Sequence, residues 1–325
     1  MPTIAFLMRV CITALTLAAC QAALAQDYPT KPIRLLAAMG AGGTGDTMAR
    51  LLASEMTKLL GQPVVVESRP AAGGSVALES VANSAPDGYT LVFTGPALIV
   101  NPLVRNTKGV GSNLADFAPI AEFATTSEIL VVNPAVPASN LTELIAYAKK
   151  NPGRLNYGSA GVGSFTNLSV ELLKQRAKIE MVHVPFQGGT AMRVAVISNQ
   201  VQVAVDGLSS ALPFIKEGKL RAIALVNSKR SAIAPEVATV DEAGLKGYAA
   251  DVWYGILAPR GTPQPIVSVL NAAIARIARN PDIRGKLAGE GTVSIGGTPS
   301  EFQTMLDEEA VRWGAVVHGA GLTEE

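Results

Sequence analysis

The sequence predicts an α/β protein made of two lobes, each with parallel strands and with helices on both faces of its sheet. Apolar runs rich in β-branched residues alternate with stretches of helical periodicity along most of the chain. At 325 residues and 48% hydrophobic composition, the chain is long enough to bury more than one core. The 31 glycines and 20 prolines favour many tight turns between regular elements.

Residues 1–25 have the pattern of a secretory signal peptide. Arg9 supplies a positive charge, the apolar run 10–19 is too short to span a bilayer comfortably, and residues 23–25 (ALA) form a small-x-small cleavage pattern. We therefore expect export to the periplasm. No later run is long and apolar enough for a membrane span, so the mature protein is expected to be soluble.

Both cysteines, Cys11 and Cys20, lie inside this leader. The mature chain would then have no disulfide, no thiolate metal site and no cysteine nucleophile. Residues 17–20 (LAAC) also resemble a bacterial lipoprotein box, and processing there would place a lipid on Cys20. We favour the ordinary signal peptide, because a good cleavage site follows five residues later.

The charges are balanced, with 27 Lys and Arg against 26 Asp and Glu. No basic field is available to hold a phosphate backbone, which argues against nucleic acid as a partner.

The first part of the mature chain is predicted to fold in the order βαβαβ. Strands are expected at 33–39, 64–67 and 89–94, with a helix at 46–60 and a second helix that begins at residues 73–75 (GGS). Spacing by three and four places the apolar side chains of the helix 46–60 on one face, and Gly61 closes it. This order implies parallel strands.

The pattern restarts after Ala121. Strands are expected at 129–132, 155–159, 181–184, 201–205 and 220–226, and helices at 141–150, 165–175, 190–197 and 209–216. Asn140 and Glu143 have capping-box spacing before the first of these helices.

The last part contains an apolar run at 253–258 and expected helices at 266–278, 281–288 and 299–317. We expect these helices to return to the first lobe. The predicted division is therefore a leader at 1–25, lobe 1 at 26–124 and 227–325, and lobe 2 at 125–226.

The loop 40–46 (GAGGTGD) leaves an expected strand and enters an expected helix. Its glycines let a ligand approach the main chain, and the first N–H groups of a helix have no partner within the helix. The helix dipole adds attraction for an anion. The pattern predicts a carboxylate or phosphate cradle, and the alternative is a turn that only packs helix on strand. Asp46 and Arg50 are spaced to pair across one helical turn.

The same loop satisfies G-x-G-x-x-G through Gly40, Gly42 and Gly45, and Glu67 follows at the end of the next strand. That spacing imitates a dinucleotide-binding fingerprint, so an oxidoreductase stays open as an alternative. Export away from the main nicotinamide pool and the absence of an accompanying proton-transfer group argue against it.

A second loop, 159–167 (SAGVGSFTN), also joins a strand to a helix, but in the other lobe. Its hydroxyls can donate hydrogen bonds, or they can simply cap the helix. Two donor-rich loops, one in each lobe, favour a cleft that clasps a carboxylate. Gly73 and Gly74 open a third, less specific loop. Asp206 ends a strand of the second lobe and can accept from a ligand or cap the next helix.

The chain offers little for catalysis. His183 lies in an apolar strand and is expected to be a satisfied core residue, and His318 suits the end of the last helix. We find no metal-ligand spacing, no G-x-S-x-G elbow and no base placed beside a nucleophile. We therefore expect no catalytic residues, no metal and no cofactor.

Seven stretches carry a resemblance to a known family: 28–34 (YPTKPIR), 61–67 (GQPVVVE), 85–91 (APDGYTL), 183–186 (HVPF), 218–222 (GKLRA), 240–244 (VDEAG) and 257–263 (LAPRGTP). In these the chain resembles the Bug family, the substrate-binding receptors of tripartite tricarboxylate transporters. The resemblance implies a type 2 periplasmic-binding fold with a cleft between two lobes. It also implies a small carboxylate or related ligand, held largely by backbone amides.

Carried over residue by residue, the resemblance implies the following ligand-binding positions: Gly42, Gly43 and Asp46 in the first loop, Ser159, Gly161, Gly163, Ser164 and Thr166 in the second, and Asp206. The chain departs from the family where Met39, Gly40 and Ala41 replace an aromatic residue and prolines, and at Asn167 and Gly207. These departures put the ligand's identity in doubt.

We therefore expect a monomeric, exported solute-binding protein that captures a small carboxylate and does no chemistry on it. Inner-membrane permease subunits of a tripartite transporter are the expected partners. A sensory binding protein without a transporter stays open as an alternative.

Overall fold

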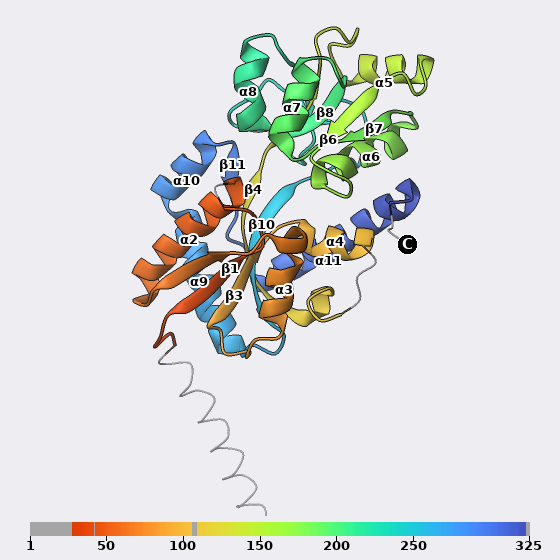
Figure 1. Cartoon of the computed structure of the whole chain (residues 1–325). Coiled ribbons are helices and arrows are strands. Elements are labelled where there is room, and N and C mark those ends of the chain that lie inside the picture. Colours follow the sequence, from red (N-terminus) through yellow and green to blue (C-terminus); the bar gives the residue numbers. More distant parts are fainter. Residues whose placement is uncertain (1–27, 42, 106–108, 323–325) are drawn as a thin grey trace, which may run out of the picture.

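The computed structural model describes residues 28–41, 43–105 and 109–322. The expected leader, Cys20 and Gly42 lie outside these residues. Two sheets form the centres of two α/β lobes, as predicted, and Figure 1 shows them one above the other. We call them the large-sheet lobe and the small-sheet lobe.

The large sheet has six strands, and its parallel part is the predicted βαβαβ unit. In spatial order the strands are β11 (Thr292–Ser294), β4 (Phe117–Thr126), β10 (Val252–Pro259), β3 (Thr90–Thr94), β1 (Ile33–Ala37) and β2 (Val64–Ser68). β1 pairs in parallel with β2 and β3, whereas β10 is antiparallel to β3 and β4. The sheet is therefore mixed, which the expectation of parallel strands did not include.

Helices cover both faces of the large sheet, as expected from the alternation of side chains along a strand. In β1, Leu35 packs in the cluster that contains α2 and α9, and Leu36 packs in the cluster that contains α3 and α4. The helices of this lobe are α2 (Thr44–Leu60), η1 (Ala71–Gly74), α3 (Ser75–Ala82), α4 (Ala97–Arg105), η2 (Leu114–Asp116), α9 (Gln264–Arg279), α10 (Pro281–Gly289) and α11 (Pro299–Ala320).

The small sheet has five strands, in the spatial order β7 (Val182–Pro185), β6 (Asn156–Ser159), β8 (Val203–Gly207), β5 (Glu128–Val132) and β9 (Arg221–Leu225). β6 is parallel to β7 and β8, whereas β5 is antiparallel to β8 and β9. Its helices are α5 (Leu141–Lys150), α6 (Phe165–Ala177), α7 (Gly189–Ile197) and α8 (Leu208–Lys216).

Two crossover segments join the sheets. Only Ser127 separates the end of β4 from the start of β5, and the chain returns from β9 to β10 through residues 226–251. The lobe limits at 124/125 and 226/227 stay a prediction.

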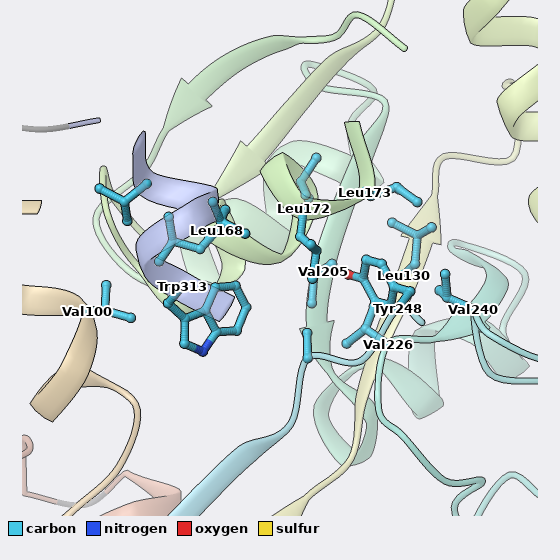
Figure 2. Packing of buried hydrophobic residues seen from close by; sticks show 14 of the residues in the cluster. Val100, Leu130, Leu168, Leu172, Leu173, Val205, Val226, Val240, Tyr248 and Trp313 are labelled. Atoms are coloured by element: carbon cyan, nitrogen blue, oxygen red, sulfur yellow. The ribbon is translucent and has the colours of Figure 1, made fainter. Parts of the chain in front are cut away.

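The last helix, α11, lies between the lobes on one side. Trp313 contacts Phe165 of α6 edge-on, with ring centroids 5.8 Å apart. Figure 2 shows Trp313 beside Val100 of α4 and Leu168 of α6, so one apolar cluster includes residues of both lobes. The C-terminal helix therefore ties α4 to α6 close to the place where the two lobes meet.

α4, β4, β11 and the short 3-10 helix η2 were not predicted. α4 contains Pro102, which breaks the usual helical pattern, and β4 contains Pro119, which lowers the strand signal. β11 has three residues, too few for a periodic signal. Within the described residues, no helix has the length and hydrophobicity needed to cross a membrane.

Candidate functional site

A cavity of about 500 Å³ lies between the two lobes. Its walls come from the β1–α2 loop, the β3–α4 turn, α4, β10 and the loop before α6. Among the described residues, no Asp, Glu, Lys, Arg or His side chain lines it. The lining residues are Ala38, Met39, Gly40, Ala41, Gly43, Gly45, Gly95, Pro96, Ala97, Val100, Asn101, Gly163, Ser164, Phe165, Val252 and Tyr254.

The β1–α2 loop brings the start of α2 to this cavity. Gly43 is the N-cap residue in an extended conformation, and no side chain caps the helix there. The first N–H groups of α2 therefore have no acceptor within the helix. A Cβ on Gly45 would lie 2.0 Å from Met39 Sδ and 2.8 Å from Tyr254 Cε1, so a side chain at this position would have to displace the Met39 thioether and the Tyr254 ring. Of the predicted residues in this loop, Gly43 lines the cavity.

Asp46 is buried behind the loop. Arg50 donates to both carboxylate oxygens at 2.9 and 3.2 Å, which confirms the predicted pair. The Ser68 hydroxyl donates to the same carboxylate at 2.5 Å. Asp46 therefore fixes the first turn of α2 against β2, and it does not line the cavity.

The third glycine loop lies next to the first. Gly74 has φ +94°, and a Cβ there would lie 2.3 Å from the carbonyl oxygen of Ala38. The Asn101 amide, which lines the cavity, donates to the carbonyl of Gly73 at 2.7 Å. The η1–α3 turn therefore supports the cavity wall from behind.

The loop before α6 supplies the wall of the small-sheet lobe. Ser164 is the N-cap of α6 and accepts from the N–H of Asn167, while its hydroxyl donates to the carbonyl of Gly161 at 2.7 Å. A Cβ on Gly163 would lie 2.8 Å from Val104 Cγ1 of α4, so this loop touches the opposite lobe directly. Gly163 and Ser164 line the cavity.

The other predicted donors of this loop point inward. The Ser159 hydroxyl donates to the carbonyl of Gly161 at 2.9 Å, and the Thr166 hydroxyl accepts from the N–H of Ala160 at 2.9 Å. Ser159, Gly161 and Thr166 are absent from the cavity lining. They brace the loop that carries Ser164.

Ser159 also meets a histidine, contrary to the expectation that no base accompanies a nucleophile. Its hydroxyl lies 2.7 Å from His183 Nε2, and the imidazole stacks on Tyr157. Burial lowers the pKa of His183. Ser159 itself is completely buried, so a substrate has no access to its oxygen. His183 is half-buried and hydrogen-bonded, which is close to the satisfied core histidine that we expected.

Asp206 lies at the carboxyl end of β8 and forms an ion pair with an arginine. The sequence pattern did not indicate this pair. Arg193 of α7 donates to its two carboxylate oxygens at 2.5 and 2.9 Å, and the N–H of Gly207 donates at 3.0 Å. Gly207 takes the N-cap position of α8. The helical fold of α7 brings Arg193 to Asp206, and no sequence spacing signals this.

Glu67, the acidic residue of the dinucleotide alternative, is held by two arginines. Arg34 donates to it at 2.8 and 3.1 Å, and Arg69 at 3.1 Å. Tyr254 is a further residue of the cavity that no sequence motif indicated; its ring forms part of the wall and stacks on Phe93 with centroids 5.8 Å apart. The apolar run that contains Tyr254 predicts a strand but does not indicate that this side chain faces the cavity.

Comparison with known proteins gives one family. The family described as "Tripartite tricarboxylate transporter family receptor" matches residues 48–322. Protein BugT of Bordetella pertussis is 31% identical over 301 residues, which cover 91% of each chain.

Two solved structures from Rhodopseudomonas palustris are similar throughout. One, solved with adipate, has a TM-score of 0.77 and 33% identity over 91% of this chain and 99% of that chain. The other, MatC with bound malate, has a TM-score of 0.74 and 33% identity over 89% of this chain and 100% of that one.

Proposed function

Because this chain belongs to the Bug family of tripartite tricarboxylate transporter receptors, we propose that it captures a small carboxylate in the cavity between its lobes. The observation that carries the proposal is the start of α2, which no side chain of the described residues caps. It faces the Ser164 loop of the other lobe across a cavity whose described wall residues carry no charge. Relatives of similar sequence were solved with adipate and with malate, both carboxylates.

The proposed contacts are neutral. Main-chain N–H groups at the start of α2 and α6 replace water around the anion, and the two helix dipoles add attraction of roughly 0.3–1 kcal/mol each. Gly42, Gly43, Gly163 and Ser164 are the proposed ligand positions of the two loops. Asp46, Ser159, Gly161 and Thr166 act by holding these loops in shape.

Bridging contacts drive lobe closure in this proposal. A ligand that binds both lobes favours the closed form by the difference between its affinities for the two states. Permease subunits of a tripartite transporter are the proposed partners that recognise the closed form. A sensory role without a transporter predicts the same binding but a different partner.

Members of this family are periplasmic binding proteins. We propose export of this chain through the leader at 1–25, with cleavage after Ala25. Lipid attachment at Cys20 is the alternative, and a native mass spectrum of the exported protein distinguishes the two by mass and reports any retained metabolite.

Calorimetry on a matched pair of variants tests the proposed site. Ser164→Ala removes the N-cap of α6 at the cavity. The control Asn140→Ala removes the N-cap of α5, which is not part of the cavity lining. The Asn140 side chain accepts from the N–H of Glu143 at 3.0 Å. Each should lower the free energy of unfolding by about 0.5–2 kcal/mol.

Only Ser164→Ala should also weaken binding of mono- and dicarboxylates, by roughly threefold to tenfold. Equal carboxylate affinity in the two variants would show that the loop before α6 does not bind the ligand. If no carboxylate binds to the wild-type chain and a nicotinamide dinucleotide does, the oxidoreductase alternative replaces this proposal.

A further inference from the structure

Tyr254 lines the cavity together with Val252, which lies two residues earlier on the same face of β10. The register of β10 against β4 shifts between Tyr254 and Gly255, as at a β-bulge, and bulges often re-aim a side chain next to a functional site. Pairing of β10 with β3 begins only at Gly255. Tyr254 therefore lies just beyond the carboxyl end of a strand of the parallel unit, where open α/β sheets bind their ligands.

The Tyr254 ring is held in place by its neighbours. It stacks on the fully buried Phe93, with an angle of 8° between the ring planes. One ring edge faces two glycines: Cδ1 is 3.7 Å from the position that a Cβ of Gly95 would take, and Cε1 is 2.8 Å from that of Gly45. Cε1 is bonded to the ring carbon that carries the hydroxyl. The hydroxyl end of the ring therefore lies at the first turn of α2.

The hydroxyl of Tyr254 is unpaired, although tyrosine hydroxyls inside proteins usually find a partner. The buried Tyr157 donates to Glu171, and the buried Tyr248 donates to the carbonyl of Ser169 at 2.9 Å. Within the described residues, the Tyr254 hydroxyl makes no hydrogen bond, and its oxygen is not enclosed by the protein. Because the side chain lines the cavity, this hydroxyl is available to a ligand.

The phenol is suited to an anion. Burial, and then the charge of Glu128, raise the pKa of Tyr254 above its ordinary value, so the hydroxyl keeps its proton at neutral pH. A neutral phenol donates one hydrogen bond, and an O–H···O⁻ bond to a carboxylate is among the strong ones. The first N–H groups of α2 are donors at the same place, because no side chain of the described residues caps that helix.

We propose that the Tyr254 hydroxyl donates a hydrogen bond to the ligand carboxylate at the start of α2, and so completes this anion site with a side-chain donor from β10. The inference rests on the proposed function and adds to it a specific ligand contact. The contact is made to the carboxylate that all the proposed ligands share, so it serves mono- and dicarboxylates alike. The hydroxyl has no partner in the ligand-free fold, so its removal should affect binding alone.

Titration calorimetry with a panel of carboxylates that includes butyrate, adipate and malate tests this contact. Tyr254→Phe keeps the ring and removes only the hydroxyl. It should raise the dissociation constant of each carboxylate by roughly tenfold, and the midpoint of urea unfolding should not fall.

Tyr248→Phe is the matched control. It removes a hydroxyl that is bonded to the carbonyl of Ser169, and Tyr248 is not part of the cavity lining. This variant should unfold at a lower urea concentration, because a buried carbonyl loses its donor. Its carboxylate affinities should stay within about twofold of wild type.

The outcomes separate the two proposals. Equal carboxylate affinities in wild type and Tyr254→Phe would overturn the contact and leave carboxylate capture standing. A loss confined to malate would mean that Tyr254 binds the hydroxyl group of that ligand, which also overturns the inference. Tyr254→Phe that loses stability together with affinity would show that the hydroxyl supports the fold, with the same consequence. Failure of the whole panel to bind wild type would remove the proposed function itself.

Discussion

At the scale of single residues, the charges nearest the cleft are paired with each other and do not line its wall. Arg193 holds Asp206 and Arg50 holds Asp46, each through two hydrogen bonds. The cavity wall itself has no charged side chain among the described residues. In the proposed site, an anion would therefore meet neutral donors, and its release would leave no buried charge unpaired.

Asp46→Asn tests whether the first of these pairs is structural. The change keeps the shape but weakens the bonds from Arg50 and Ser68, and should lower the free energy of unfolding by about 1–3 kcal/mol. Because Asp46 lies behind the loop, carboxylate affinity should stay within about twofold. Urea denaturation and calorimetry check both numbers. A variant of normal stability that loses binding would place Asp46 in direct contact with the ligand.

Contacts between residues close together in the sequence could be predicted, and contacts between distant residues could not. Asp46 and Arg50 are one helical turn apart, so spacing alone gave their pair. Arg193 and Asp206 lie on different elements, and Ser159 reaches His183 only because β6 and β7 are neighbours in the sheet. Contacts of this kind depend on the tertiary fold and leave no local signal.

At the scale of elements, two helix starts face the cavity and are built differently. α2 begins at Gly43 without a side-chain cap, and α6 begins at Ser164 with one. The loop before α6 satisfies many of its own polar groups, whereas the loop before α2 depends on the neighbouring η1–α3 turn for support. The start of α2 is therefore the more open of the two donor sites.

Gly74→Ala tests this support, with Gly188→Ala as its control. Both glycines have positive φ values, +94° and +90°, which alanine rarely adopts, so each substitution should lower the free energy of unfolding by roughly 1–3 kcal/mol. A Cβ at Gly74 also meets the Ala38 carbonyl at 2.3 Å, whereas nothing lies within 4 Å at Gly188.

Thermal unfolding and carboxylate titration compare the two variants. Gly74→Ala should be the less stable and should weaken carboxylate affinity, because Ala38 belongs to the cavity wall. Similar effects of the two substitutions on stability and on affinity would show that the η1–α3 turn does not shape the site.

Most elements could be predicted from periodicity and turn residues, and the exceptions have local causes. α5 begins at Asn140 with the predicted cap. The helix α4 could not be predicted because Pro102 lies inside it, although it provides Val100 and Asn101 to the cavity wall. Because of this proline, the part of the cavity wall that α4 provides could not be predicted from the sequence.

At the scale of the whole molecule, the two lobes are joined by two crossovers and by α11. Asn227 bridges the crossovers: its amide donates to Thr126 carbonyl at 2.8 Å and to Asp251 at 2.9 Å, and its oxygen accepts from Glu128 N–H. On the α11 side, Trp313 and Phe165 share one apolar cluster. We therefore expect the lobe closure proposed above to pivot about these two places.

Asn227→Ala tests the hinge, with Asn151→Ala as a control in the C-cap of α5. Loss of Asn227 leaves buried groups of both crossovers unpaired, so stability should fall by about 2–4 kcal/mol, more than in the control. Small-angle scattering should show a larger ligand-free radius of gyration for Asn227→Ala. An unchanged radius together with control-like stability would show that the amide does not set the lobe arrangement.

The most direct test of carboxylate capture is a crystal structure of this chain with adipate or malate. We predict one carboxylate within hydrogen-bond distance of the first N–H groups of α2, with Ser164 on the opposite wall and the lobes closed around the ligand. A ligand bound elsewhere, such as the groove on the crossover segments lined by Glu122, Asp251 and Arg312, would contradict it.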